Sequence, residues 1–307
     1  MIEILSAPPY LSIQDTGRPG YRAAGVPISG AMDRPSLATA NRVAGNTTDT
    51  AALEWALAGG TIRFAHPTHF ALAGATVEAT LDGAPIAADH RHAAHTGAVL
   101  HVARFTAGRF VYLAVHGGID VPPVMGSRAT YLPARLGGHH GRLLRSGDQL
   151  PISIVTDPHT SPSTPEYRTS AGMDTVRIVR GPNARRVDDV GWATLFTSSF
   201  IVNAASDRIG YRLDGPPLGG SGWGTLPSAP MRPGIVQLTE GGTLIVLMPD
   251  GPTVGGYPAI AAVVSADLAV LAQRCPGDSV RFREITIAEA ENIARRAMDQ
   301  FAKRTPR

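Results

Sequence analysis

The sequence predicts a mainly β protein made of two related β-rich modules. Most of the 307 residues fall into short segments rich in Val, Ile, Leu, Thr and Phe, separated by Gly and Pro. Turn signals recur roughly every eight to twelve residues, which is typical of antiparallel barrels or sandwiches. The expected strands cover residues 61–65, 69–74, 75–83, 110–115, 175–181, 199–205, 234–238, 243–248 and 280–285.

The first expected helix covers residues 33–46. Asp33 is a suitable N-cap, Pro35 falls in the first turn, and Gly45 is placed to end the helix. These three signals agree on both ends of the segment.

Two further short patterns predict helices near the C-terminus. Residues 265–274 form one, and residues 286–304 form the other, which begins with a capping box of Thr286 and Glu289. Because the helices lie beside the strand-rich segments and do not alternate with strands, a doubly wound parallel sheet is not expected.

Three motifs occur in the same order in both halves of the chain, which indicates a tandem duplication. They are GYRAAGVP at 20–27 with GYRLDGPP at 210–217, GRFVYLAVHGG at 108–118 with GTLIVLMPDG at 242–251, and Gly147-Asp148 with Gly277-Asp278. Residues 156–172, rich in Pro, Ser and Thr, are expected to be a linker or surface loop between modules 1–155 and 173–307.

Composition excludes several classes of function. The net charge is only +3 and no basic block is present, so no nucleic-acid partner is expected. The single lysine, Lys303, argues against Schiff-base and P-loop chemistry. With one cysteine, Cys275, an internal disulfide cannot form. No long apolar segment or signal peptide is seen, so no membrane association and a cytoplasmic location are expected.

Residues 14–33 concentrate glycine and charge and form the first candidate site. Asp15, Arg18 and Asp33 are candidate catalytic residues, while Arg22 and Ser29 are candidates for substrate binding. Arginine provides forked donors for carboxylate or phosphate, and glycine permits close approach of the backbone to a ligand. The alternative is a barrel corner with internal Arg–Asp pairs, in which Asp33 serves only as a helix cap.

Three later segments complete the candidate set. In 116–131, Arg128 is the catalytic candidate, and Gly117, Gly118 and Ser127 are candidates for substrate binding. In 206–218, Asp207 is the catalytic candidate, and Arg208, Tyr211 and Arg212 are candidates for substrate binding. In 252–260, the candidates for substrate binding are Gly255, Gly256 and Tyr257. The two Gly-Gly turns and the repeated arginines predict paired loops at the mouths of two barrels. Solvated turns are the alternative for each segment, and the histidine spacing predicts no metal site.

Taken together, these motifs resemble the family of 5-oxoprolinase C subunits, also labelled allophanate hydrolase subunit 2 or KipA-like. The carboxyltransferase half of urea carboxylase is in the same superfamily. The matching segments are QDTGRPGYRAAGVPISGAMD, ANRVAGN, ALEWAL, YLAVHGGIDVPPVMGSRATY, LGGHHGRLLRSGD, SDRIGYRLDGPPL, GGYPAI and ADLAVLAQRCPGDSVRF, which follow one another over nearly the whole chain.

The resemblance implies tandem cyclophilin-like β-barrels and one component of an enzyme that opens 5-oxoproline to glutamate with ATP and Mg²⁺. It also implies a tight partner, the KipI-like B-type protein of the same enzyme, and a further partner, its A-type protein. The arginines of the candidate sites are then expected to stabilise phosphoryl and carboxylate charge, and Asp15, Asp33 or Asp207 to orient water or Mg²⁺.

Two departures from the family pattern leave the chemistry open. Ser228-Ala229 stands where relatives have a Ser-Glu pair, and Gly251-Pro252 stands where they have Arg-Gln. The resemblance also implies an alternative, a biotin-dependent carboxyltransferase acting on urea or a related amide. A KipA-like regulator that antagonises a kinase inhibitor is another.

Overall fold

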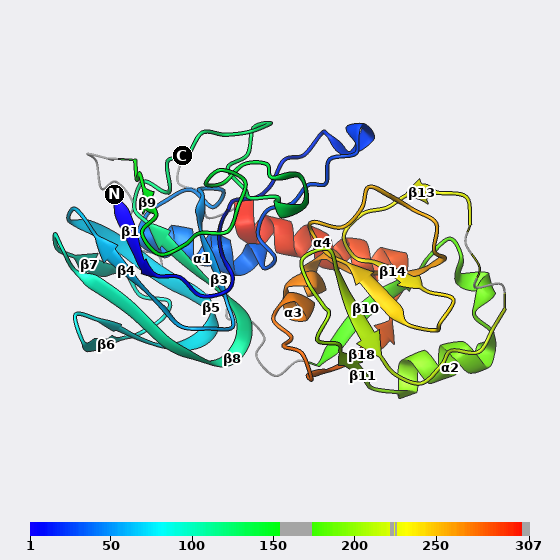
Figure 1. Ribbon diagram of the computed structural model, residues 1–307. Coiled ribbons are helices and arrows are strands. Elements are labelled where there is room, and N and C mark those ends of the chain that lie inside the picture. Colours follow the sequence, from blue (N-terminus) through cyan, green and yellow to red (C-terminus); the bar gives the residue numbers. More distant parts are fainter. Residues whose placement is uncertain (154–173, 222–223, 225, 303–307) are drawn as a thin grey trace. The chain divides into compact units, whose positions relative to one another are not determined.

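The computed structural model describes residues 1–153, 174–221, 224 and 226–302 (Figure 1). The chain divides into two compact units, of which the first contains Met1–Arg18 and Ser29–Ala171 and the second contains Pro19–Ile28 and Gly172–Lys303. The predicted linker at 156–172 lies outside the described residues, so the division into modules 1–155 and 173–307 stays a prediction.

The first unit contains a nine-stranded sheet. Its strands are β1 (Ile2–Ser6), β2 (Leu11–Gln14), β3 (Ala52–Ala56), β4 (Gly60–Phe64), β5 (Thr68–Leu81), β6 (Ala84–Ile86), β7 (His92–Ala94), β8 (Val99–Val115) and β9 (Gln149–Leu150). The main path runs β2-β3-β8-β4-β1-β9, and β5 pairs with β6, β7 and β8. All these pairings are antiparallel, as the turn pattern predicts.

The long strands β5 and β8 bend the sheet into a half-barrel. One part of β8 pairs with β3 and another with β4, and β5 pairs along most of the length of β8. The bend falls at Gly74, which has φ +116 and would place a Cβ 2.5 Å from the Phe110 carbonyl oxygen. Glycine permits this close approach. The segments 69–74 and 75–83, predicted as separate strands, are therefore one strand with register shifts on either side of Thr76.

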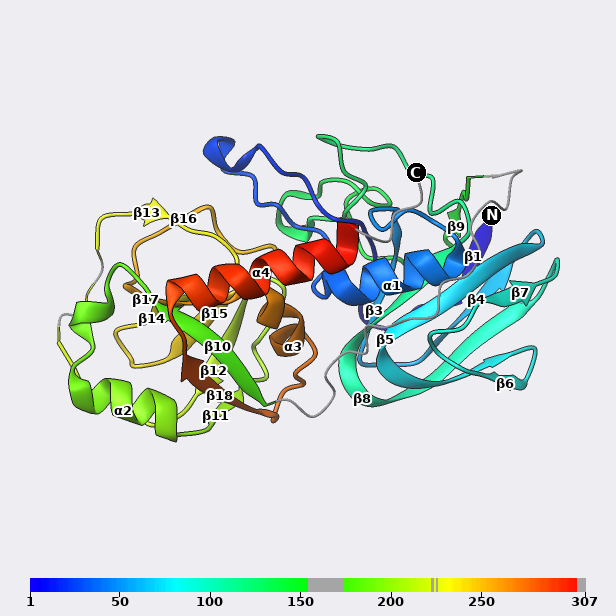
Figure 2. The ribbon, with the colours of Figure 1, turned by 180° about the vertical axis from the view of Figure 1, so that it is seen from behind.

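A buried apolar cluster fills the half-barrel. Its largest members include Trp55, Phe64 and Phe70, all fully buried. Helix α1 (Arg34–Ala44) packs on β5 and β8, as the view from behind shows (Figure 2). Asp33 caps its first turn by accepting from the Ser36 N–H, and Gly45 ends it in the left-handed conformation, so the predicted helix signals are confirmed.

The second unit is a closed seven-stranded barrel, in the order β10-β17-β14-β15-β12-β11-β18. Parallel pairing of β10 with β18 closes it. The strands are β10 (Thr175–Arg180), β11 (Phe200–Val202), β12 (Gly210–Asp214), β14 (Ile235–Leu238), β15 (Leu244–Leu247), β17 (Ala259–Val263) and β18 (Ser279–Glu284). Alternate residues of β10 and β18 are buried, so each strand directs one side to the core. The predicted mainly β fold with tandem barrel modules is confirmed.

Short elements surround this barrel. A two-stranded sheet joins β13 (Ala229–Pro230) to β16 (Val254–Gly255), and the helices are α2 (Asp189–Thr197), α3 (Leu268–Ala272) and α4 (Ile287–Ala302). Helix α4 carries the predicted capping box: Thr286 N donates to Glu289, and Glu289 N donates to Thr286 Oγ1. Helix α2 was not predicted, although Asp188 caps it by accepting from Gly191 N. No helix in the described part of the chain is long and apolar enough to cross a membrane.

The third sequence repeat is also a structural repeat. In the first unit Ile4 and the turn at Asp148 exchange backbone bonds: Ile4 N donates to Asp148 O, and Gly147 N donates to Ile4 O. The second unit has the same two bonds between Val202 and the turn at Asp278. Both aspartates also accept from the backbone N–H three residues earlier, at 2.8 and 2.7 Å.

The GYR repeat, in contrast, is not a structural repeat. Residues 210–214 form strand β12, whereas Arg22–Ala24 form the short 3-10 helix η1. Strand β12 pairs with β11 and β15, whereas residues 20–22 belong to no strand of the first sheet. The predicted equivalence of the two GYR loops is therefore wrong, because similar letters fall at different positions of the two modules.

Candidate functional site

Asp15 joins two distant loops of the first unit. Its Oδ1 accepts from Gly17 N and from Ser127 Oγ, both at 2.7 Å, and its Oδ2 accepts from Arg128 N at 2.5 Å. Ser127 in turn accepts from Ala129 N. Two predicted segments, 14–33 and 116–131, thus meet at one buried carboxylate. The sequence did not predict this pairing, because the residues are 112 positions apart.

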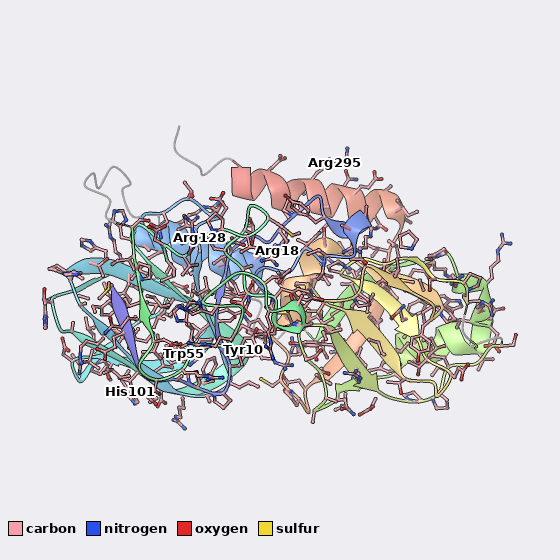
Figure 3. All side chains as sticks on the ribbon, turned by 45° about the horizontal axis from the view of Figure 1, so that its top comes forward. Tyr10, Arg18, Trp55, His101, Arg128 and Arg295 are labelled. Carbon is pink, nitrogen blue, oxygen red and sulfur yellow. The ribbon has the colours of Figure 1, made fainter. Side chains whose placement is uncertain are left out.

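Arg18 is fully buried beneath the same loops. Its Nη2 donates to the Ala129 carbonyl oxygen, and a Cβ on Gly137 would lie 2.8 Å from that nitrogen. Figure 3 labels Arg18 and Arg128 close together at this end of the first unit. The Arg18 guanidinium therefore holds the loop that begins at Ser127.

The segment from Ser29 to Asp33 packs against Asp15 through its backbone. Ala31 N donates to Asp15 O, and a Cβ on Gly30 would lie 2.6 Å from Gly17 N. Ser29 has φ 57 and is fully buried, with Oγ donating to the Thr130 carbonyl at 3.4 Å. The segment is thus held by close backbone contacts.

The buried side chains of Glu54 and Tyr112 bind the backbone N–H groups at residues 32 and 33. Glu54 Oε2 accepts from Met32 N at 2.9 Å and from the Tyr112 hydroxyl at 2.7 Å, and that hydroxyl accepts from Asp33 N at 2.8 Å. Burial, with the nearby charges of Glu54 and Asp33, raises the pKa of Tyr112 well above its ordinary value of 10.0. Sequence reasoning missed Glu54, and the available signal was one acidic residue inside the apolar segment ALEWAL.

Arg128, Gly117 and Gly118 lie in the same long connection between β8 and β9. Arg128 Nε donates to Val121 O at 2.7 Å, and Nη2 lies 3.1 Å from Asp120 Oδ1. Its side chain is 38% exposed, so this guanidinium reaches solvent while Arg18 does not. Gly117 N donates to Asn46 Oδ1, which ties the Gly-Gly turn to the residues that follow α1.

In the second unit, Arg208 and Asp250 form a buried ion pair. Arg208 Nε and Nη2 lie 2.8 and 3.0 Å from the two Asp250 oxygens, and the side chains are 6% and 2% exposed. Asp250 N also donates to Arg208 O. The pair connects the predicted segment 206–218 to the loop that leads into β16.

The other candidates near Arg208 differ in exposure. Tyr211 is fully buried, and its hydroxyl donates to the Ala272 carbonyl at 2.8 Å. Arg212 is exposed and donates from Nη1 to Ala205 O. Asp207 is exposed, and its Oδ1 accepts from the N–H groups of the two residues that precede Tyr211.

The GGY segment pairs with β13. Gly255 lies opposite Ala229 in the two-stranded sheet, Gly256 O accepts from Leu226 N, and Tyr257 is 41% exposed. Ala229 stands where the resemblance leads one to expect a glutamate, and its side chain provides no carboxylate opposite Gly255.

Gly251 lies in a tightly packed loop. A Cβ on Gly251 would lie 2.9 Å from the carbonyl oxygens of both Ile209 and Met248. A side chain at position 251 would require this backbone to shift.

Arg22 is the candidate with the least compensated charge. It lies in η1, and neither Nη1 nor Nη2 has a hydrogen-bond partner among the described residues, although both nitrogens are inaccessible to solvent. Burial, and then the nearby charge of Arg232, lowers the pKa of Arg22. Arg232 follows Met231, whose N–H donates to the Thr253 carbonyl just before the GGY segment. Two neighbouring guanidiniums of this kind favour an anion.

The histidines of residues 90–95 contact the backbone. His90, His92 and His95 each lie 2.7–2.9 Å from a carbonyl oxygen. Within the described residues, no group of three or more His, Cys, Asp or Glu side chains is arranged to hold a metal ion.

The chain contains a closed barrel in one unit and a half-barrel in the other, with arginine-bearing loops in both, which fits a carboxyltransferase-type module. The chain belongs to the family described as carboxyltransferase domain, subdomain A and B, whose model matches residues 24–284. The resemblance predicted from the motifs is thereby confirmed.

Individual relatives share most of this chain. It is 38% identical over 290 residues to the C subunit of 5-oxoprolinase from Escherichia coli strain K12, and the match covers 94% of this chain and 93% of that protein. It is 32% identical to the urea amidolyase of Saccharomyces cerevisiae, covering 97% of this chain but 18% of that protein. The crystal structure of K. lactis urea amidolyase matches with a TM-score of 0.88 and 29% identity, over 98% of this chain and 20% of that one.

Proposed function

We propose that this chain is the C subunit of a 5-oxoprolinase. The observation that carries the proposal is the match to the Escherichia coli protein, which extends over nearly the full length of both chains. In the urea amidolyases the matching part is about a fifth of a longer protein. The expected partners of this chain are the KipI-like B-type protein and the A-type protein.

The reaction under this proposal is hydrolysis of the lactam of 5-oxoproline to L-glutamate. A lactam amide is a poor electrophile, and ATP would supply a phosphoryl group that converts its oxygen into a good leaving group. The side chains of the protein would then bind the substrate carboxylate, neutralise phosphoryl charge and orient the attacking water. An ATP-consuming assembly of this kind is expected in the cytoplasm.

We assign anion binding to the less satisfied arginines. Arg22, with Arg232 beside it, is the first candidate, because both of its terminal nitrogens lack a hydrogen-bond partner among the described residues. Arg212 and Arg128 are further candidates, because their guanidiniums reach solvent. These donor sets fit a carboxylate or phosphate. Asp207, exposed and with only Oδ1 engaged, is the candidate for orienting water.

We assign positioning roles to the buried candidates. Asp15, Arg18, Ser127 and Asp33 are engaged with backbone groups or neighbouring side chains of their own unit. Their removal would move the loops that carry Arg128 and begin α1. We assign no residue of this chain to Mg²⁺, and biotin enters only in the alternative function below.

The direct test is reconstitution. The full-length chain, co-purified with its A-type and B-type partners, is expected to form ADP and glutamate from 5-oxoproline in equal amounts. Arg22→Gln should lower kcat/KM by about 100-fold, the typical effect of losing one donor to developing charge. Arg185→Gln, an exposed arginine at the end of the short helix η3 (Ala184–Arg186), is the matched control. Absence of turnover in every combination of the three proteins would contradict the proposal.

A second candidate, carboxyl transfer to an amide, is favoured by the family description itself. Under this alternative a carboxylated biotin carrier on another chain would be the donor. The same preparation, supplied with urea, ATP, bicarbonate and a biotin carboxylase, distinguishes the two. Carboxylation without glutamate formation would select the alternative.

A further inference from the structure

The first unit contains a cavity of about 570 Å³ outside the loops assigned above. It is lined by residues 7–9, 141–146, Leu132 and Arg135. Pro8 and Leu144 are buried and give part of the wall an apolar character. Its volume lies within the range of small-molecule sites, roughly 300–1,000 Å³.

Three arginines line the cavity, and only one of them has a carboxylate partner among the described residues. Arg142 lies 2.7 and 2.8 Å from the two oxygens of Asp148 and so is neutralised. Arg135 and Arg145 are exposed, and in the described part of the chain no Asp or Glu lies within ion-pair distance of either. Ser146 Oγ accepts from Ala7 N, and its hydroxyl proton remains available to a ligand.

The fold does not require Arg145 and Ser146. The second unit closes the same turn, with the same backbone bonds and the same aspartate contact, using Cys275 and Pro276 at these two positions. The turn therefore forms without a guanidinium or a hydroxyl. The arginine of the first unit is left for a role other than closing the turn.

We propose that this cavity binds a small organic phosphate. A phosphate monoester carries about −1.5 to −2 charges at neutral pH, which matches two uncompensated guanidiniums better than a single carboxylate does. The apolar wall suits an organic body attached to the phosphate. The site is separate from the proposed oxoprolinase chemistry, so either proposal can fail without the other.

The test is a binding titration on the full-length chain without its partner proteins. Phenyl phosphate is the probe, and benzoate has the same ring with one negative charge. Calorimetry is expected to show saturable binding of phenyl phosphate, about 10-fold tighter than benzoate. Arg135→Gln and Arg145→Gln should each weaken phenyl phosphate binding about 10-fold, while Arg185→Gln changes it less than about twofold.

Three results would overturn the proposal. They are no saturable binding to the unaltered chain, equal affinity for benzoate and phenyl phosphate, or equal weakening by Arg185→Gln. Circular dichroism and thermal unfolding of each variant verify that it is folded. Because Arg135 and Arg145 are both exposed, either variant alone is sufficient for the test.

Discussion

At the scale of single residues, burial separates arginines with similar sequence surroundings. Arg18 and Arg208 are buried and bind groups of their own unit. Arg128 and Arg212 reach solvent. The sequence does not distinguish these environments, since both kinds of arginine have a Gly within two residues along the chain.

Removing one partner of the buried Arg208–Asp250 pair is expected to lower the free energy of unfolding strongly. Arg208→Ala leaves the Asp250 carboxylate buried without its cation, so the free energy of unfolding is expected to fall by about 3–5 kcal/mol. Arg104→Ala breaks a pair with Glu78 in which both side chains are exposed, so it should lower the free energy of unfolding far less than Arg208→Ala does. Urea unfolding of both variants measures the difference, and equal losses would contradict the interpretation.

Asp148 predicts a loss of stability in acid. Its hydrogen bond from Arg142 is the main cause that lowers the Asp148 pKa below its ordinary 3.8. A lowered folded pKa adds stability at pH values above 3.8, and that stability disappears as the pH falls through the lower folded value. Arg142→Gln should therefore be less stable than the unaltered chain at about pH 6, and the difference should vanish toward about pH 2. Urea midpoints across this range are the measurement.

At the scale of elements, short-range signals predicted the helix ends. Asp33 with Ser36, and Thr286 with Glu289, form caps within one turn of chain, so their geometry depends little on the rest of the fold. Long-range effects decided the strands. The segments either side of Gly74 form one strand because both pair with β8.

Two variants of Asp33 distinguish its role as a helix cap from a role as a catalytic carboxylate. Asp33→Ala should lower the free energy of unfolding by about 0.5–2 kcal/mol, whereas Asp33→Asn should retain most of the cap. If Asp33 only positions α1, Asp33→Asn keeps the turnover of the assembled enzyme. Loss of turnover with unchanged stability in Asp33→Asn would instead show a role for its charge.

At the scale of the whole molecule, the two units share one turn but differ in the residues of that turn and in the closure of their sheets. The Gly-Asp turn has the same backbone bonds in both units, yet only the first unit places Arg145 and Ser146 there. One unit is a closed barrel, whereas the other is a half-barrel in which β8 pairs with β3 along one part and with β4 along another.

Replacing Arg22 is expected to affect the stability of the chain and the activity of the enzyme in opposite directions. Its guanidinium has a like charge nearby and no hydrogen-bond partner for either terminal nitrogen among the described residues. Arg22→Met should therefore keep or raise the free energy of unfolding of the chain, while lowering 5-oxoproline turnover by about 100-fold in the assembled enzyme. Arg185→Met should change neither quantity. A destabilised Arg22→Met variant would show that Arg22 is structural.

The sequence by itself determined the mainly β class, the helix caps, the Gly-Asp turn repeat and the family, because these depend on local propensity or on motifs of a few residues. Tertiary structure alone decided which candidate side chains meet. Asp15 reaches Ser127 and Arg208 reaches Asp250 only after the strands have paired. The GYR repeat shows the same limit, since strand pairing, and not similarity of letters, places a residue in a barrel.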